Sequence, residues 1–304
     1  MSRIEKSSST DFISTSTYVE HMELDRYRPG NLVYTDWRAL MTGDGTTIHL
    51  IAGKSSELGY REGVGAAARF SRITGFTQIS EKLVVVADSH NGCMRLIDRT
   101  TNKTSVFSGQ CRNGVGYQDG RPGQFGYPRS VVMDQRDKNQ LLIVDQNNRA
   151  VRTVNVKSQI VGTFVRSESL WAMIGITQDE KSGDLLVTAL DALYRVTYTK
   201  RTVSLISGSP GSISYGYRDS TLLDSLFDWP KELIFITPKT LLVADDNNHK
   251  LRLVDMNSDK VTTLNVKNSL YSPTSLLLTN DSLYVGQYRK IIRCMCDYYS
   301  IFLT

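Results

Sequence analysis

The stretch Leu83-Val-Val-Val-Ala-Asp88 decides how this sequence is read, because the chain repeats it. It returns as Leu141-Leu-Ile-Val-Asp145 and as Leu241-Leu-Val-Ala-Asp245. Seven residues after each Asp, a second apolar run contains an arginine: Arg95, Arg152 and Arg252. Fainter copies keep this offset from Thr188 to Arg195 and from Gly286 to Arg293, and a shortened copy ends at Asp36. Six copies spaced by about 50 residues fill the chain, and a fixed period of this size is typical of repeat architectures.

A second element precedes each strong copy. It reads Gly59-Tyr-Arg-Glu-Gly63, Gly116-Tyr-Gln-Asp-Gly120 and Gly216-Tyr-Arg-Asp-Ser220. A phenylalanine then enters the next apolar run, at Phe70, Phe125 and Phe227, and two copies continue with the aromatic–proline pairs Tyr127-Pro128 and Trp229-Pro230. Because three separate features keep their order, chance similarity is a poor explanation.

The apolar runs predict β-strands. They are short, rich in Val, Leu, Ile and Thr, and bounded by Asn, Asp, Gly and Ser, and no stretch shows a sustained helical period. Continuous apolar runs predict strands buried on both faces, and a closed ring of blades protects edges that an open solenoid would expose. We therefore predict an all-β, six-bladed β-propeller of four-stranded antiparallel blades. The blades are approximately residues 15–53, 54–110, 111–166, 167–208, 209–265 and 266–304.

The two ends of the chain determine how the ring of blades is closed. Residues 17–24 are expected to form an inner strand of the first blade within a single propeller of residues 15–304. Residues 1–14 have nothing to bury, so we expect them to be disordered or loosely attached, and we expect deletion of residues 1–12 to change thermal stability little. Tyr299–Leu303 is expected to form the outer strand of the last blade, unless residues before Thr17 supply it.

These motifs, in this order, resemble the NHL repeat. The resemblance covers roughly residues 30 to 295 and is most specific in the second, third and fifth copies, of which the fifth keeps Asn248-His249 before Leu251-Arg252. The fourth copy lacks the Asp, and the sixth has Gly286 in its place. The resemblance implies a propeller fold. NHL propellers serve many unrelated functions, so function has to be argued from sites.

Propeller topology tells which residues gather on one face. Strands a to d of each blade run outward from the central channel, so the b–c turns and the loops from strand d to the next strand a share a face. The Asp-to-Arg segments are b–c turns, and the Gly-Tyr segments are d–a loops. We interpret the repeated Asp, Asn and Arg as turn residues and a cross-strand charge pair rather than as ligands, and Tyr60, Tyr117 and Tyr217 likewise as structural.

Positions at which the copies differ are the better candidates for function. Around the proline slot, the residue before it is Arg72, Tyr127, Trp229 or Ser272, and the residue after it is Thr74, Arg129, Lys231 or Thr274. These positions begin strand a at the mouth of the channel. Aromatic and cationic side chains there suit a peptide, an anionic small molecule or single-stranded nucleic acid. The predicted binding residues are Arg72, Tyr127, Arg129, Trp229 and Lys231. The alternative is that Tyr127 and Trp229 only pack under the d–a loops.

The sequence favours a binding scaffold for a protein or peptide over an enzyme. A zinc-dependent lyase would need several histidines along the channel, but the chain has four histidines in all, of which His90 and His249 lie in b–c turns. A calcium-dependent lactonase would need carboxylate and amide ligands at the starts of inner strands. We predict no cofactor and no metal. One alternative is an RNA-binding NHL propeller, although the acidic residues Glu62, Asp119 and Asp219 in the d–a loops are unfavourable for RNA. The other alternative is a propeller hydrolase or lyase.

Composition and cysteine content limit the class of protein and the compartment in which it works. Of the 304 residues, 40% are hydrophobic and 22% charged, with a net charge of +5, which excludes wholesale disorder. No run reaches the roughly 18 apolar residues of a membrane helix, and the first residues lack the apolar core of a signal peptide. We expect a monomer.

Cys93 and Cys111 flank a turn at residues 100–103, which would set them nearly opposite each other and permit a disulfide. This pair, with sequons at Asn102 and Asn280, favours an extracellular over a cytoplasmic setting.

Overall fold

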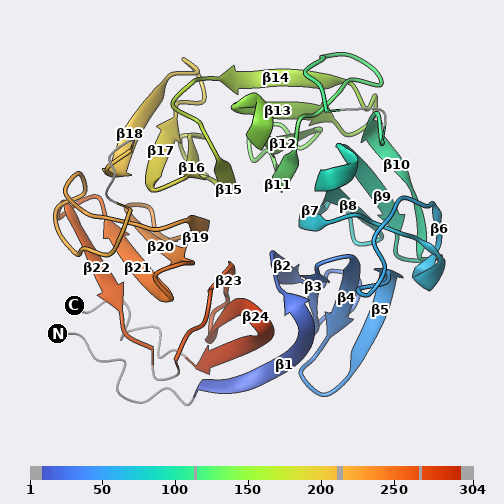
Figure 1. The fold of residues 1–304 in the computed structure, drawn as a ribbon, viewed down its shortest axis with the longest axis horizontal. Coiled ribbons are helices and arrows are strands. Elements are labelled where there is room, and N and C mark those ends of the chain that lie inside the picture. The colour runs from blue at the N-terminus through green and yellow to red at the C-terminus, as the bar shows by residue number, and fades with distance from the viewer. Residues whose placement is uncertain (1–8, 113–114, 211–214, 267–268, 296–304) are drawn as a thin grey trace.

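The computed structural model describes residues 9–112, 115–210, 215–266 and 269–295. In it the strands form six antiparallel sheets arranged around a central channel, and the predicted six-bladed β-propeller is confirmed (Figure 1). Helix is limited to three short 3-10 turns, η1 (Gly65–Ala67), η2 (Ser89–Asn91) and η3 (Gln146–Asn148). No helix in the described part of the chain is long and apolar enough to cross a membrane.

The first three blades follow the chain from the channel outward. Blade one contains β2 (Met22–Leu24), β3 (Leu32–Asp36), β4 (Ala39–Gly43) and β5 (Ile48–Gly53). Blade two contains β7 (Ile73–Gln78), β8 (Leu83–Asp88), β9 (Cys93–Asp98) and β10 (Lys103–Gly109), and the short β6 (Gly63–Val64) pairs outside β10 as a fifth strand. Blade three contains β11 (Pro128–Met133), β12 (Gln140–Asp145), β13 (Ala150–Asn155) and β14 (Val161–Arg166).

The other three blades complete the ring. Blade four contains β15 (Met173–Gln178), β16 (Leu185–Ala189), β17 (Ala192–Val196) and β18 (Val203–Gly208). Blade five contains β19 (Pro230–Thr237), β20 (Thr240–Asp245), β21 (Lys250–Asp255) and β22 (Lys260–Leu264). Blade six contains β23 (Ser275–Leu278), β24 (Ser282–Met295) and β1 (Ser9–Tyr18).

The strand β24 occupies two positions in blade six. Its first half pairs with β23, as in Ser275 with Gly286, and its second half pairs with β1. Between the halves Arg289 has a φ of 64°, and Arg293 Nε donates to Ser282 Oγ at 2.8 Å across the bend. Blade six therefore has the same inside-to-outside order as the others, with its outermost strand taken from the start of the chain.

This closure corrects, for residues 9–14, the expectation that residues 1–14 are disordered or loosely attached. Residues 9–14 belong to β1 and pair antiparallel with β24, and Ile13 is 3% exposed within the core between blades six and one. The physical reason is that the outer edge of β24 offers unpaired backbone groups, which a polar, alternating segment can satisfy. Residues before Thr17 thus supply the outer strand, and Tyr299–Leu303 lies outside the described residues. Of residues 17–24, only Met22–Leu24 forms the inner strand of blade one.

The hydrophobic core lies between the blades. The described residues contain six buried clusters, and each joins two neighbouring blades. Val33 and Leu40 of blade one, for example, pack with Phe76 and Val86 of blade two. Burial on both faces of each sheet explains why the strand runs are continuously apolar.

The repeated Asp, Asn and Arg form a buried latch in each strong blade. In blade three, Arg152 Nη1 donates to Asp145 Oδ2 at 2.9 Å, and Asn148 Nδ2 donates to the same oxygen at 2.7 Å. The other oxygen of Asp145 accepts the backbone N–H groups of Gly126 and Tyr127. Blades two and five repeat the arrangement with Asp88 and Arg95, and with Asp245 and Arg252. The predicted cross-strand charge pair is confirmed, and it holds the loop that begins the same blade.

Aromatic rings from the d–a loops enclose each latch arginine. The guanidinium carbon of Arg152 lies 4.6 Å from the ring of Tyr117 and 5.4 Å from that of Phe125. Asp119 of the same loop accepts from Arg152 Nη2 at 2.7 Å, and Asp219 does the same for Arg252. In blade two Glu62 stands in this position, and it instead accepts from the backbone N–H of Val106. The repeated Tyr and Phe are therefore structural.

A disulfide joins Cys93 to Cys111, with a Cα–Cα distance of 5.1 Å. The register differs from the expected one, because Cys93 pairs with Gly109 and a bulge lies between Val106 and Ser108. Cys111 follows the end of β10, so the bond ties the start of β9 to the d–a loop rather than bridging two facing strand residues.

Candidate functional site

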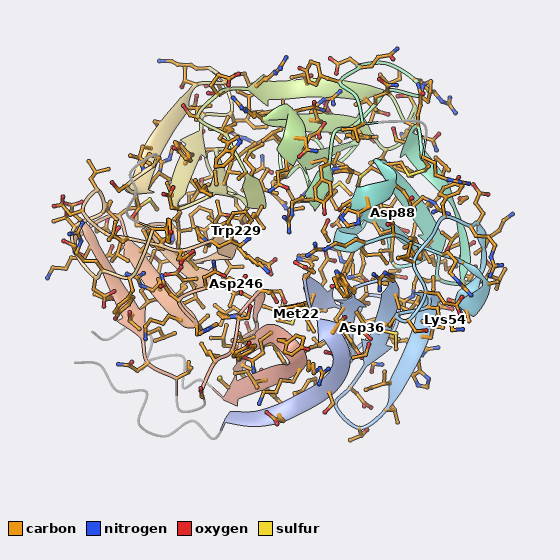
Figure 2. All side chains as sticks on the ribbon, viewed as in Figure 1. Met22, Asp36, Lys54, Asp88, Trp229 and Asp246 are labelled. Carbon is orange, nitrogen blue, oxygen red and sulfur yellow. A yellow bond between two sulfur atoms is a disulfide. The ribbon has the colours of Figure 1, made fainter. Side chains whose placement is uncertain are left out.

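One residue from each blade lines the channel at its upper mouth, the mouth on the face of the b–c turns and d–a loops. A small cavity on the axis is lined by Glu20, Thr74, Arg129, Ile174, Lys231 and Thr274, together with the residues that follow several of them. Three of the six are charged. Figure 2, viewed down the channel, shows Trp229 and Asp246 beside it on blade five.

Glu20 is the point at which the predicted cations converge. Its carboxylate accepts a short hydrogen bond from Arg72 Nη2, and Oε2 lies 3.9 Å from both Arg129 Nη2 and Lys231 Nζ. The Glu20 side chain is 3% exposed. Burial alone would raise the pKa of this carboxyl, but Lys231, Arg72 and Arg129 together lower it to about 2. Glu20 is therefore ionised at neutral pH and links blades two, three and five through one carboxylate.

Glu20 was not predicted as a site residue, because no proline marks the first blade. Tyr18-Val19-Glu20 occupies the place that Tyr127-Pro128-Arg129 has in blade three. The carbonyl of Val19 accepts from Thr274 Oγ1 at 2.6 Å and from Ser275 Oγ at 2.9 Å, which fixes this segment at the channel. An alignment of the inner strands by their aromatic residue could have found it.

The structure brings together four of the five predicted site residues. Arg129 and Lys231 are buried in the channel, Arg72 is half-buried at its edge, and the guanidinium carbon of Arg129 lies 5.8 Å from the ring of Tyr127. Trp229 immediately precedes the inner strand of blade five, has a φ of 57° and is half-buried. Within the described ranges, no ring contact or ion pair joins Trp229 to the other four residues.

Lys231 has further partners on the side of blades five and six. Its Nζ lies 3.0 Å from Asp246 Oδ2, and the hydroxyl of Ser272 donates to the same carboxylate. The backbone N–H of Ser272 donates to His249 Nδ1 at 3.0 Å. On this side of the mouth each charged group therefore has an opposite charge beside it.

One of the four histidines, His21, lines the channel. His21 Nδ1 lies 2.8 Å from Glu232 Oε1, and Nε2 lies 3.6 Å from Glu23 Oε1. Burial lowers the pKa of His21, but Glu232 and Glu23 outweigh burial and raise it to about 10. The imidazolium is thus a fixed cation below the mouth. The described residues contain no group of three or more His, Cys, Asp and Glu suited to a metal ion.

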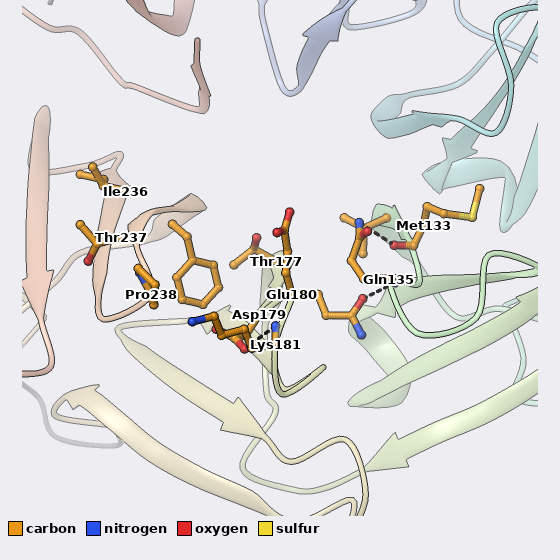
Figure 3. A pocket seen from close by; sticks show the side chains of 12 residues that line it. Met133, Gln135, Thr177, Asp179, Glu180, Lys181, Ile236, Thr237 and Pro238 are labelled. Carbon is orange, nitrogen blue, oxygen red and sulfur yellow. Dashed lines mark hydrogen bonds between the residues drawn. The ribbon is translucent and has the colours of Figure 1, made fainter. Parts of the chain in front are cut away.

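A larger hollow, of about 440 Å³, opens on the lower face. It lies at the ends of β11, β15 and β19, and Thr177, Glu180 and Lys181 line it (Figure 3). Phe235 is also among its lining residues. The sequence analysis did not anticipate it, because a–b turns carry none of the repeated motifs. Its lining mixes apolar and exposed charged side chains and indicates no particular chemistry.

Comparison with known proteins supports the fold. No protein-family model and no curated protein matches the sequence, so the NHL assignment stays a prediction. An auxiliary nutrient binding protein from Bacteroides ovatus matches with a TM-score of 0.71 at 12% identity, over 94% of this chain and 76% of that one. A gluconolactonase from Xanthomonas campestris matches with a TM-score of 0.67 at 8% identity, over 97% and 91%. A virginiamycin B lyase from Staphylococcus aureus gives 0.62 at 10% identity, over 96% and 99%. Similarity at these identities shows the propeller fold alone.

Proposed function

We propose that this chain is a non-enzymatic binding propeller whose upper face holds an acidic segment of a protein or peptide. The observation that carries the proposal is the convergence of Arg72, Arg129 and Lys231, from three blades, on one mouth. A divalent cation of the kind a lactonase uses would face these three cations at the same place, so the residues present do not suit it.

Aromatic side chains around the mouth add contact surface of the kind found at protein interfaces. Tyr127 and Trp229 are half-buried at the channel edge. Further out, the d–a loops of the upper face expose Trp171 at 53% and Tyr271 at 57%. Aromatic residues offer a large contact area for little loss of side-chain entropy, which suits a binding surface.

The competing nucleic-acid function gains one argument from the structure. The acids Asp119 and Asp219 are committed to the buried Arg152 and Arg252, so they do not repel a phosphate as freely as the sequence suggests. The cations of the mouth, however, lie inside a narrow channel beside Glu20 and Asp246 rather than along an open groove. We therefore favour a protein or peptide ligand.

Fluorescence anisotropy with labelled probes tests the proposal. The probes are three peptides of equal length, rich in Glu, Gln or Lys, and a single-stranded RNA of similar length. We expect the Glu-rich peptide to bind, and Lys231→Gln to weaken it about tenfold because a charged hydrogen bond is lost. Lys239→Gln, on the lower face, is the matched control and should bind as wild type. Tighter binding of the RNA with a steep salt dependence would contradict the proposal.

A further inference from the structure

The upper mouth is uneven in its balance of donors and acceptors. Lys231 has Asp246 beside it, but the side formed by blades one to three holds buried N–H groups without acceptors. Around the described residues 37, 38, 72 and 129, four buried donors have no hydrogen-bond partner: Trp37 Nε1, Arg38 Nε, Arg72 Nε and Arg129 Nε. Buried donors are nearly always paired in proteins, so four unpaired donors at one place require an explanation.

These donors belong to one neighbourhood. The guanidinium carbons of Arg38 and Arg72 lie 4.7 Å and 5.7 Å from the ring of Trp37. The rings of His90 and Tyr127 are 5.3 Å apart, and the guanidinium carbon of Arg129 lies 5.8 Å from Tyr127. Trp37 and Arg38 form the b–c turn of blade one, and His90 lies in η2 of blade two. We call these six residues the arginine pocket: Trp37, Arg38, Arg72, His90, Tyr127 and Arg129.

Arg129 differs from the arginines of the latches. Arg152 and Arg252 also leave Nε unpaired, but their terminal nitrogens donate to carboxylates and carbonyls. Arg129 is 6% exposed, and its guanidinium donates no hydrogen bond to any residue the structure describes; its nearest carboxylate oxygen is 3.9 Å away. A guanidinium taken out of water without hydrogen bonds is costly, which indicates that a ligand completes it.

The charges of the pocket favour an anion. Arg72 and Arg129 share one carboxylate, that of Glu20, which Arg72 already engages, and Arg38 donates to the backbone carbonyl of Ser55 rather than to a carboxylate. Asp36 precedes Trp37, but its oxygens accept from the hydroxyls of Ser16, Thr17 and Ser55. Burial and then Arg72, Arg38 and Arg129 lower the pKa of His90, so all three guanidinium groups act on this imidazole. His90 is therefore neutral at physiological pH, and the positive charge of the cluster comes from its three guanidinium groups.

We propose that the arginine pocket is an oxyanion site that takes a carboxylate of the bound peptide, either an acidic side chain or the C-terminus. Guanidinium groups present paired N–H donors that match the two oxygens of a carboxylate. The indole N–H of Trp37 adds a neutral donor, and Tyr127 packs against His90 and Arg129. The inference rests on the proposed function for the identity of the ligand, although the pocket itself requires only an oxyanion. A phosphate group has the same oxygen chemistry, and the test separates the two.

Titration of the indole N–H signals tests the pocket directly. The chain has three tryptophans, so its NMR spectrum has three indole signals, and Trp37→Phe assigns one of them. The probes are acetyl-diglycine with a free carboxylate, the same compound as its amide, and inorganic phosphate. We expect the carboxylate to shift the Trp37 signal and the amide to leave it in place. A shift with phosphate alone would overturn the assignment to carboxylate, and no shift with either anion would overturn the site.

Variants connect the pocket to peptide binding. Arg38→Gln and Arg72→Gln should each weaken the Glu-rich peptide about tenfold, as expected for loss of a charged hydrogen bond. Arg136→Gln, in the lower-face turn after β11, is the matched control. If the peptide binds wild type and both pocket variants equally, the inference fails and the proposed function stands. If no peptide binds but the carboxylate still shifts Trp37, the proposed function fails and the oxyanion site stands.

Discussion

At the scale of single residues, the latch arginines differ from blade to blade in the number of carboxylates that they contact, and so in their expected contribution to stability. Arg152 is fully buried and holds both Asp145 and Asp119, whereas Arg95 lies 3.3 Å from Asp88 and contacts no second carboxylate among the described residues. We expect Arg152→Met to lower the free energy of unfolding by about 3 to 5 kcal/mol, because it leaves a buried carboxylate unpaired. Arg95→Met, the matched change, should cost clearly less. Urea unfolding measures both, and equal losses would contradict this ranking.

His21 gives the fold a pH dependence of definite sign. Its pKa is raised to about 10 by Glu232 and Glu23 against the opposing effect of burial. A raised pKa in the folded state stabilises the fold below the unfolded value of about 6.5, and this stability is lost as the pH rises toward 10. One such group gives a slope of up to about 1.4 kcal/mol per pH unit.

We therefore expect stability to fall between pH 6.5 and 10 more steeply in wild type than in His21→Gln. Unfolding by urea at several pH values measures the two slopes. Parallel curves across this window would show that His21 does not carry an ionic contact in the folded state.

At the scale of elements, β1 closes the ring. It pairs with β24 from Ser9 to Tyr18, buries Ile13, and brings Asp11 within 2.8 Å of Lys290. Deleting residues 1–14 removes most of these contacts and exposes the edge of β24. We expect the melting temperature to fall by roughly 10 °C or more, since several kcal/mol of pairing and burial are lost. Deletion of residues 1–8 keeps β1 whole and is the control. Equal melting temperatures for the two deletions would contradict closure by β1.

The disulfide is the second element-scale constraint. It joins Cys93 to Cys111 across a separation of 18 residues. Closing a loop of this size stabilises a fold by about 3 kcal/mol, so reduction should lower the free energy of unfolding by a similar amount. Thiol titration of the unfolded, unreduced protein should find at most two of the four cysteines reactive. Four reactive thiols would exclude the bond and remove the main support for an extracellular setting.

At the scale of the whole molecule, the repeats were sufficient to predict the propeller but not its closure. Leu83–Asp88 and its copies carry strand, turn and latch in one motif, so the blades could be read along the chain. The pairing of β1 with β24 joins residues almost a full chain length apart, and no repeated motif marks it.

The candidate site was predictable only in part, for the same reason. Arg72 stands before the repeated proline slot and Arg129 and Lys231 after it, and the ring geometry brings the three together. Glu20 lies in the blade with the weakest motif. Trp37 and Arg38 occupy a b–c turn that elsewhere is structural, so neither was distinguishable from turn residues without side-chain positions.

Hydrogen exchange with and without the Glu-rich peptide tests the central claim, that the upper face is the binding face. The two faces are made of different turns, so one measurement compares them. We predict slower exchange on binding in the turns that contain Trp37 and His90 and at the start of β11, and no change in the lower-face turns near Glu180 and Pro238. Protection confined to the lower-face turns would show that the hollow there, and not the arginine-lined mouth, holds the ligand.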